Sequence, residues 1–224
     1  MKLYMHPVSN ASRPVRLFLA ENKIPCEEQV IDLLTGEHYK EPYASINPNR
    51  LVPMLEDGDF RLTESSAILK YLAGKYDLPS YPQDLKKRAK VDEMMDWFNT
   101  QFYRDYGYGL TYPQLYPHHK RPSEEIHAGT IAWGKEKAQG WFKLLNDFWI
   151  GPKKQYLCGD EITIADYFGV CLTTIGEVIQ CEFSAYPNVE RWVNNMRKLR
   201  TWNQINEAHY GFADAVKAQK FTTL

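Results

Sequence analysis

The chain has 224 residues, of which 44% are hydrophobic, and its 27 basic and 28 acidic residues give a net charge of −1. This length is long for one domain and fits a small domain followed by a larger one. The balanced charge gives no reason to expect nucleic acid or an anionic membrane as a partner, and no apolar run approaches the length of a membrane span.

The cysteine content indicates a reduced compartment. The chain has four cysteines, with no CxxC pair and no histidines at metal-binding spacing. We therefore expect a cytoplasmic protein without a disulfide framework or a metal site. The first ten residues also lack the apolar stretch of a signal peptide.

The first third of the chain predicts alternating strands and helices. Residues 2–6 form a predicted strand, and Pro14 suits the first turn of a helix because a helix leaves the N–H at that position unpaired. Residues 26–33 form a second predicted strand, and 34–50 are irregular and rich in turn residues.

A hairpin and a helix complete this part. Residues 53–58 and 60–65 form predicted strands joined by Asp57-Gly58, which is a strong hairpin signal. Residues 65–76 place apolar side chains on one helix face. The order βαβ, loop, ββα predicts an α/β domain over residues 1–78.

The rest of the chain predicts an all-α domain. Residues 79–86 carry two prolines and polar residues and form a predicted linker to a helical domain over 87–224. Helical patterns cover 86–107, 123–150 and 164–180, with a break rich in Tyr, Pro and Gly at 107–122. Thr163 and Asp166 have the spacing of a capping box that starts a buried helix, and we interpret this motif as structural.

Three local features predict a ligand site in the first domain. A cis peptide bond at Val52-Pro53 would expose backbone groups to an extended peptide ligand. Glu64 and Ser65 lie where a strand becomes a helix, and the free N–H groups there attract a carboxylate. Ser9 precedes the first helix. Each feature also has an ordinary structural interpretation, namely a trans proline or a helix cap.

Together these features resemble the cytosolic glutathione transferases. The similarity rests on three segments: MKLYMHPVSNASRPVRLFLAENKIP, NPNRLVPMLEDGDFRLTESSAILKYL and YLCGDEITIADYFG. It covers nearly the whole chain and is strongest to the theta class and its bacterial relatives, which include the dichloromethane dehalogenases. The resemblance implies a thioredoxin-like first domain, an all-helical second domain, glutathione as co-substrate and a homodimer.

The resemblance also implies roles for individual residues. Ser9 matches the catalytic serine, which would donate a hydrogen bond to the glutathione sulfur and stabilise the thiolate without forming a covalent intermediate. The glutathione-binding positions are His38, Arg50, Leu51, Val52, Pro53, Glu64 and Ser65. Theta enzymes often carry a lysine where this chain has Leu51, and Arg50 could supply that charge instead.

The electrophile is expected between the domains. The aromatic side chains of 97–116 suit such a pocket, and we predict that Phe102, Tyr103, Tyr106 and Tyr112 line it, although Phe102 also has the spacing of a buried helix face. Arg104 is interpreted as a surface residue. The segment after residue 208 is a candidate cover for the pocket, by analogy with theta-like enzymes.

The expected reaction is glutathione transfer to a small hydrophobic electrophile such as an alkyl halide, an epoxide or a hydroperoxide. A glutathione-dependent thiol-disulfide reductase or peroxidase is an alternative, and the reductase would need a cysteine at the start of the first helix, where positions 9–12 are Ser-Asn-Ala-Ser. A non-catalytic glutathione-binding scaffold stays open. Large apolar residues around the predicted helix at 91–106 suggest that one face of this helix packs against a second subunit.

Overall fold

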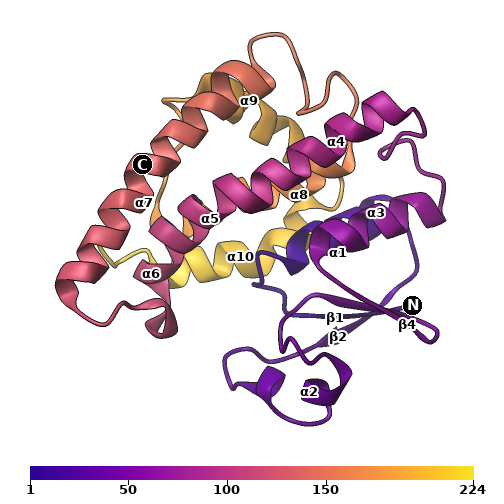
Figure 1. Ribbon diagram of the computed structural model, residues 1–224, viewed down its shortest axis with the longest axis horizontal. Coiled ribbons are helices and arrows are strands. Elements are labelled where there is room, and N and C mark those ends of the chain that lie inside the picture. Colours follow the sequence, from indigo (N-terminus) through magenta and orange to yellow (C-terminus); the bar gives the residue numbers. More distant parts are fainter.

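The computed structural model describes all 224 residues as an α/β part followed by a helical part (Figure 1). The first part contains β1 (Lys2–Met5), α1 (Ser12–Glu21), β2 (Glu27–Val30), α2 (Tyr43–Ile46), β3 (Met54–Asp57), β4 (Phe60–Thr63) and α3 (Ser65–Lys75). The strand order is β2-β1-β3-β4. β1 and β2 are parallel and the other two pairs are antiparallel, as the predicted βαβ and ββα units require.

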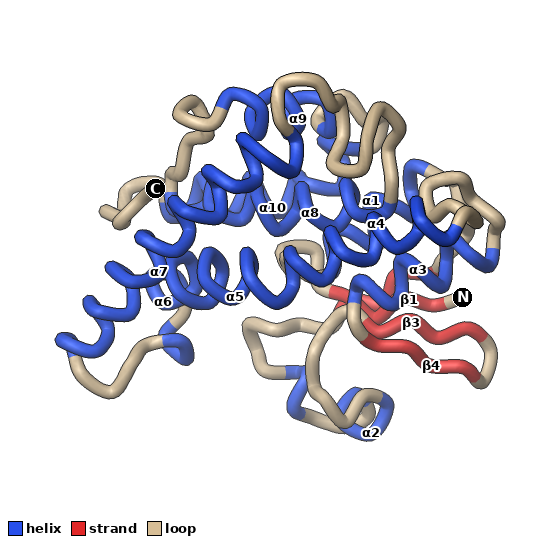
Figure 2. The backbone as a smooth tube through the Cα atoms, turned by 45° about the horizontal axis from the view of Figure 1, so that its top comes forward, coloured by secondary structure: helices blue, strands red, loops and turns tan.

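The sheet buries both of its faces because its side chains alternate. Leu3 and Leu55 point into the main core under α1 and α3, whereas Tyr4 and Met54 join a small cluster with Tyr43 of α2. Figure 2 shows α1 and α3 between the sheet and the other helices, with α2 on the opposite side. The sheet therefore has the short helix and its loops on the face away from the helical part.

The helical part begins with α4 (Leu85–Trp97) and continues through wider π-helical turns. Its other helices are α5 (Tyr103–Asp105), α6 (Tyr112–Leu115), α7 (Glu124–Leu144), α8 (Ile164–Thr174), α9 (Pro187–Met196) and α10 (Trp202–Val216). None of the helices combines the length and hydropathy needed to cross a bilayer.

The predicted break at 107–122 was wrong in its first half, because helical structure runs to Leu115. Gly107 and Gly109 do not end the helix. Gly107 leaves room for the ring of Tyr103, and Gly109 lets the segment approach α7 closely, since a Cβ on Gly134 would lie 2.4 Å from the carbonyl carbon of Gly109. The predicted helix at 164–180 is also shorter, since α8 ends at Thr174 and one tighter turn follows.

One hydrophobic core joins the two parts of the chain. Phe18 of α1 packs edge-on against Tyr167 of α8 with ring centroids 5.2 Å apart, and both belong to the same buried cluster as Phe142 and Trp192. α8 is buried at every position, so it packs against neighbours all round. The α/β part is therefore held rigidly against the helices that cover it.

The capping box at the start of α8 is present. The Asp166 carboxylate accepts hydrogen bonds from the Thr163 N–H at 2.8 Å, the Leu157 N–H at 2.8 Å and the Trp192 indole at 2.9 Å. Burial raises the pKa of Asp166 to about 6, and these donors oppose the rise. Asp166 thus connects the start of α8 to α9, in agreement with the structural interpretation of the motif.

Candidate active site

The predicted nucleophile activator, Ser9, lies in the turn between β1 and α1. Its N–H donates to the carbonyl of His6 at 2.9 Å, and its Oγ accepts from the Ser12 N–H at 3.3 Å. Ser9 therefore caps the first N–H of α1 with its side chain, although the N-cap position itself is taken by Ala11. A capping hydroxyl uses a lone pair and keeps its proton. Within the chain the Ser9 hydroxyl donates to no acceptor, so it is free to donate to a ligand.

The Val52-Pro53 peptide bond is cis, as predicted. The loop before it is fixed by its own contacts, because the Leu51 carbonyl accepts from the Tyr43 hydroxyl at 2.5 Å and from the Asn47 amide at 2.8 Å. Neither the N–H nor the C=O of Val52 pairs with another backbone group. These two groups are available to an extended peptide ligand.

The start of α3 has the features of an anion site. Glu64 is the N-cap residue, has φ of +65° and makes no side-chain cap, while Ser65 is buried. The first N–H groups of a helix have no partner within it. Here no side chain replaces that partner, so these N–H groups and the positive end of the helix dipole are free to bind a carboxylate.

The remaining predicted binding positions lie on loops. Arg50 and Leu51 are both exposed, Leu51 to 63%, so neither is locked in place by packing. His38 has a buried Nδ1 without a hydrogen-bond partner. Burial lowers the pKa of His38, and His118 from the helical part lowers it further. A neutral imidazole therefore faces the second part of the chain at neutral pH.

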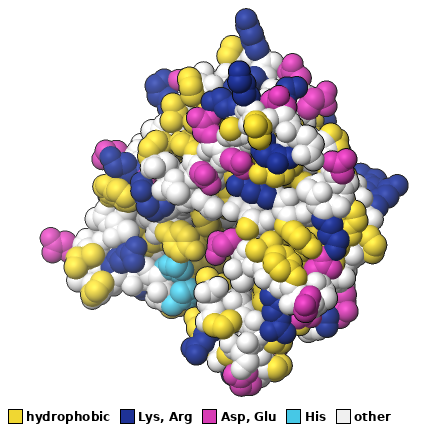
Figure 3. All heavy atoms as spheres, turned by 45° about the vertical axis from the view of Figure 1, so that its right-hand side comes forward, with side chains coloured by type: hydrophobic (Ala, Val, Ile, Leu, Met, Phe, Trp, Pro, Cys, Tyr) yellow, Lys and Arg dark blue, Asp and Glu magenta, His cyan; other side chains and the backbone are white.

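A layer of aromatic side chains from the helical part faces these residues. This tyrosine layer consists of Tyr103, Tyr108, Tyr112, Tyr116 and His119. Neighbouring rings lie 5.0–5.9 Å apart, and the hydroxyls of Tyr103 and Tyr112 are hydrogen-bonded. In Figure 3, histidine side chains (cyan) lie next to hydrophobic ones (yellow) in the recess to the left of the lower end of the molecule.

Electrostatic couplings place the layer against the first part of the chain. Burial raises the pKa of Tyr108, and the Glu64 carboxylate adds to the rise. Burial also raises the pKa of Tyr103, and the hydroxyl of Tyr112 and the nearby amide of Asn10 oppose that rise. Asn10 follows Ser9 directly, so the layer meets both the serine turn and the start of α3.

The prediction was wrong for two of the four residues expected to line the pocket. Phe102 and Tyr106 are fully buried in the helical core, where both pack on Phe142 at centroid distances of 5.0 and 4.9 Å. One face of this segment turns to the core and the other to the tyrosine layer, and the sequence alone did not show which side each ring takes. Tyr103 and Tyr112 do lie in the tyrosine layer, together with Tyr108 and Tyr116, which had not been singled out.

Arg104 is a surface residue, as interpreted. It forms an ion pair with the buried carboxylate of Asp105 at 2.7 Å, and Asp105 also accepts from the Trp141 indole. Its charge is therefore compensated away from the tyrosine layer.

The predicted cover is formed by α10 more than by the tail. Phe212 of α10 stacks on Tyr116 with centroids 6.2 Å apart, whereas the tail is fixed beside the layer through Thr222, whose N–H donates to Gln114 at 2.7 Å. A shallow polar hollow between Gln139 and Tyr186 contains none of the predicted site residues.

Comparisons with known proteins give the family to which this arrangement is similar. Residues 3–80 match the model of the glutathione S-transferase N-terminal domain, and residues 137–199 match that of the C-terminal domain. Human glutathione S-transferase theta-1 is 35% identical over 215 residues, which are 94% of this chain and 84% of the relative.

Solved structures agree with the sequence comparison. The apo form of human glutathione-S-transferase T1-1 superposes with a TM-score of 0.81 at 32% identity, covering 98% of this chain and 91% of the other. Human glutathione transferase theta-2, in complex with glutathione and an unknown ligand, gives a TM-score of 0.84 at 28% identity, covering 100% and 93%.

Proposed function

The chain belongs to the glutathione S-transferase family, and from that premise we propose that it conjugates glutathione to a small electrophile after Ser9 has stabilised the thiolate. The observation that carries the proposal is a Ser9 hydroxyl without an internal acceptor, and the uncapped start of α3 and the unpaired Val52 backbone support it. Glutathione is a tripeptide with a thiol. Its site needs a hydrogen-bond donor for the sulfur, a binding site for a carboxylate and a backbone edge that pairs with the peptide.

Each end of glutathione has a proposed partner. The γ-glutamyl carboxylate binds the N–H groups at the start of α3, and its ammonium group pairs with Glu64. The cysteinyl amide pairs with the backbone of Val52, as in β-strand addition. The glycyl end lies toward His38 and Arg50, on loops that the chain fixes less firmly.

The Ser9 hydroxyl makes the thiol reactive by stabilising its anion. A free thiol has a pKa of about 8.5, so only a few per cent is thiolate at neutral pH. A hydrogen bond to a charged group contributes roughly 1.5–3 kcal/mol and a helix N-terminus roughly 0.3–1 kcal/mol. These contributions lower the thiol pKa by about 1.5–3 units, which makes the thiolate the main form near pH 7. The thiol proton passes to solvent.

Conjugation then needs only the second substrate. The thiolate sulfur bonds to the electrophilic carbon, and the halide departs with the bonding electrons or, in an epoxide, the oxygen remains as an alkoxide. With a hydroperoxide the sulfur bonds to the outer oxygen and the alkoxide departs, and a second glutathione then converts the sulfenic acid to the disulfide and water. The tyrosine layer is the proposed wall of this pocket. Its phenol groups offer apolar faces to the substrate and hydroxyl donors to the departing oxygen or halide.

Cysteine chemistry is not favoured by the positions of the thiols. Burial raises the pKa of Cys26 to about 11 and that of Cys158 to about 12, so neither is a thiolate at neutral pH. A thiol-disulfide reductase would need a low thiol pKa.

A glutathione-affinity column followed by a conjugation assay with alkyl halides, epoxides and hydroperoxides tests the proposal. We expect retention on the column, elution by free glutathione and turnover of at least one electrophile class. Retention without turnover of any class would support the non-catalytic scaffold instead. We also propose that the enzyme acts in the cytoplasm, where its four free cysteines stay reduced.

A further inference from the structure

Arg13 carries a buried positive charge that no carboxylate compensates. The side chain is fully buried at the start of α1. Its guanidinium donates to the Oδ1 atoms of Asn10 at 2.7 Å and Asn206 at 2.8 Å, to the Cys171 carbonyl at 2.8 Å and to the Thr174 hydroxyl at 3.3 Å. All four acceptors are neutral. A buried charge is costly unless a counter-charge accompanies it.

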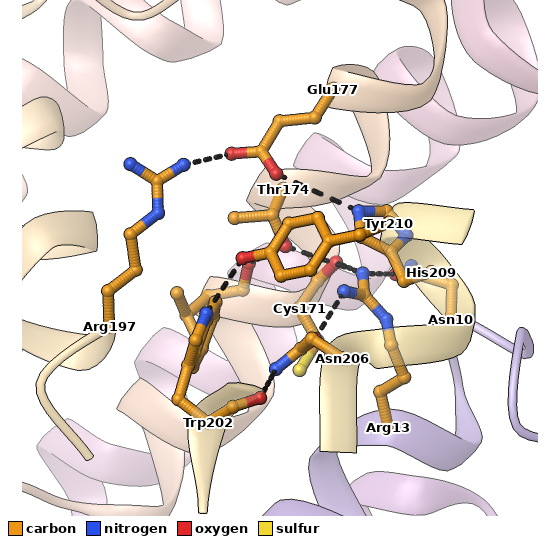
Figure 4. A network of polar contacts seen from close by, with 11 residues as sticks. Asn10, Arg13, Cys171, Thr174, Glu177, Arg197, Trp202, Asn206, His209 and Tyr210 are labelled. Carbon is orange, nitrogen blue, oxygen red and sulfur yellow. Dashed lines mark hydrogen bonds and ion pairs between the residues drawn. The ribbon is translucent and has the colours of Figure 1, made fainter. Parts of the chain in front are cut away.

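The nearest carboxylate in this network is already engaged. Glu177 pairs with Arg197 and lies 3.7 Å from the His209 imidazole (Figure 4). His209 is therefore between Glu177 and Arg13, and burial followed by the Arg13 charge lowers its pKa to about 4. A neutral His209 carries no negative charge that could offset Arg13. The positive charge of the guanidinium therefore stays uncompensated within the chain.

The field of this charge reaches the candidate active site. Arg13 is four residues after Ser9, on the first turn of the helix that Ser9 caps. It also opposes the burial that raises the pKa of Tyr116 in the tyrosine layer. An anion bound beside Ser9 is thus the group best placed to balance Arg13.

Arg13 also fixes the orientation of its neighbour Asn10. A guanidinium only donates, so the amide atom that faces it must be oxygen. The Asn10 NH₂ group then points away from Arg13, and it is buried without a hydrogen-bond partner. Asn10 is 6% exposed, and its amide lies beside the Tyr103 hydroxyl. An unpaired donor is therefore held on the residue that directly follows Ser9.

We propose that Asn10 donates a second hydrogen bond to the glutathione thiolate, alongside Ser9, and that Arg13 is the positioning residue that orients Asn10 and stabilises the anion by its buried charge. This inference rests on the proposed function, since it assigns further residues to the same thiolate. α8 and α10 hold Arg13 through Cys171 and Asn206, so the helical part contributes to the reactivity of a thiol bound by the α/β part.

The test is a pH titration of the thiolate absorbance of glutathione bound to the full chain. Asn10→Ala removes the donor, and we expect the titration midpoint to rise by about one pH unit and kcat/KM to fall roughly tenfold at pH values below the wild-type midpoint, with a smaller loss at neutral pH. The KM for glutathione should change much less, because the carboxylate and backbone contacts remain.

A second variant tests the charge without touching the glutathione site. Asn206→Asp gives Arg13 a carboxylate partner of nearly the same shape on the side away from Asn10, and the midpoint should rise again. Asn22→Ala is the matched control, because it removes a 2.8 Å hydrogen bond at the other end of α1 and should leave the midpoint unchanged. Arg13 itself is a poor target, since its loss would leave four acceptors unpaired.

The outcomes separate this inference from the proposed function. The inference is wrong if the wild-type protein binds and ionises glutathione while Asn10→Ala and Asn206→Asp give the same titration midpoint as the wild type. Arg13 and Asn10 would then have a structural role alone. If wild-type protein shows no bound thiolate at any pH, the proposed function fails and the inference fails with it.

Discussion

At the scale of single residues, capping and catalysis are compatible in one serine. The Ser9 Oγ accepts from the Ser12 N–H while its own proton stays free, so the cap fixes the hydroxyl that the proposed reaction uses. Structural and functional interpretations of this residue were alternatives in the sequence, and the geometry allows both.

Ser9→Ala should lower conjugation strongly and leave glutathione binding within a few-fold, because the variant loses thiolate stabilisation and little ground-state contact. Steady-state kinetics and calorimetric binding over pH 6–8 measure both effects. Ser9→Thr is the control, since it keeps the hydroxyl and the cap. Unchanged activity of Ser9→Ala at every pH would exclude Ser9 as the activator.

The start of α3 should affect binding more than turnover. Ser65→Ala and Glu64→Ala each remove a contact to the γ-glutamyl end, at a cost of roughly 1.5–3 kcal/mol for a hydrogen bond to a charged group. The half-saturating glutathione concentration should rise by more than the turnover falls. Normal glutathione binding by both variants would show that the γ-glutamyl group binds elsewhere.

His209 should make the stability of the protein depend on pH. Its pKa is about 4 in the folded chain and about 6.5 when unfolded, so the folded state binds fewer protons between these values. This stabilising contribution is complete above pH 6.5 and is lost as the pH falls toward 4, by about 3 kcal/mol in total.

Urea unfolding of wild-type protein and His209→Gln at several pH values isolates this contribution, because other titrating groups cancel in the difference. The advantage of wild type over the variant should shrink as the pH falls from 7 to 4.5. A constant difference would mean that His209 titrates alike in both states.

At the scale of elements, short helices and turns depend on a few polar contacts. α8 begins at the Thr163 cap, and Asp166 links that start to Leu157 and to Trp192 of α9. Because α8 is buried at every position, loss of the contacts at its start would disturb the packing of helices from both parts of the chain.

Asp166→Ala should therefore destabilise the fold without acting on the chemistry directly. It leaves several buried donors without an acceptor, and we expect a loss of about 3–5 kcal/mol in the free energy of unfolding. Urea denaturation measures the loss, and Asp160→Ala is an exposed control on the preceding loop. A cost below about 1 kcal/mol would show that water replaces the carboxylate.

At the scale of the whole molecule, the apolar residues around 91–106 do not support a dimer as the sequence suggested. Met94, Met95, Phe98 and Phe102 are buried within one chain, and Trp97 packs against Trp141 and Trp149. The apolar residues around 91–106 are thus covered without a second subunit. Exposed apolar side chains occur instead on α7, where Ile126 is 54% and Trp133 46% exposed, two turns apart on one face.

We still expect a homodimer, now with this face of α7 in the interface. Sedimentation equilibrium at micromolar concentration should give about twice the 26.2 kDa of one chain. A stable interface of this kind buries roughly 2,000 Å² or more, and Trp133→Glu should weaken it. A monomeric mass with full activity would contradict the expectation, and a dimer unaffected by Trp133→Glu would place the interface elsewhere.

The sequence determined what local pattern and chemistry can determine. The succession of strands and helices in the first part of the chain, the hairpin at Asp57-Gly58 and the cap at Thr163 follow from residues close together in the chain. The cis Val52-Pro53 bond was implied by the family resemblance. The positions of Ser9, Glu64 and Ser65 followed from the family resemblance. The tertiary structure decided what depends on contacts between distant segments: which rings of 97–116 face the core, why Gly107 and Gly109 continue a helix, and that Arg13 is buried among neutral partners from α8 and α10. No local pattern shows these features, because the burial and charge balance of a side chain depend on elements that the fold brings together from far along the sequence.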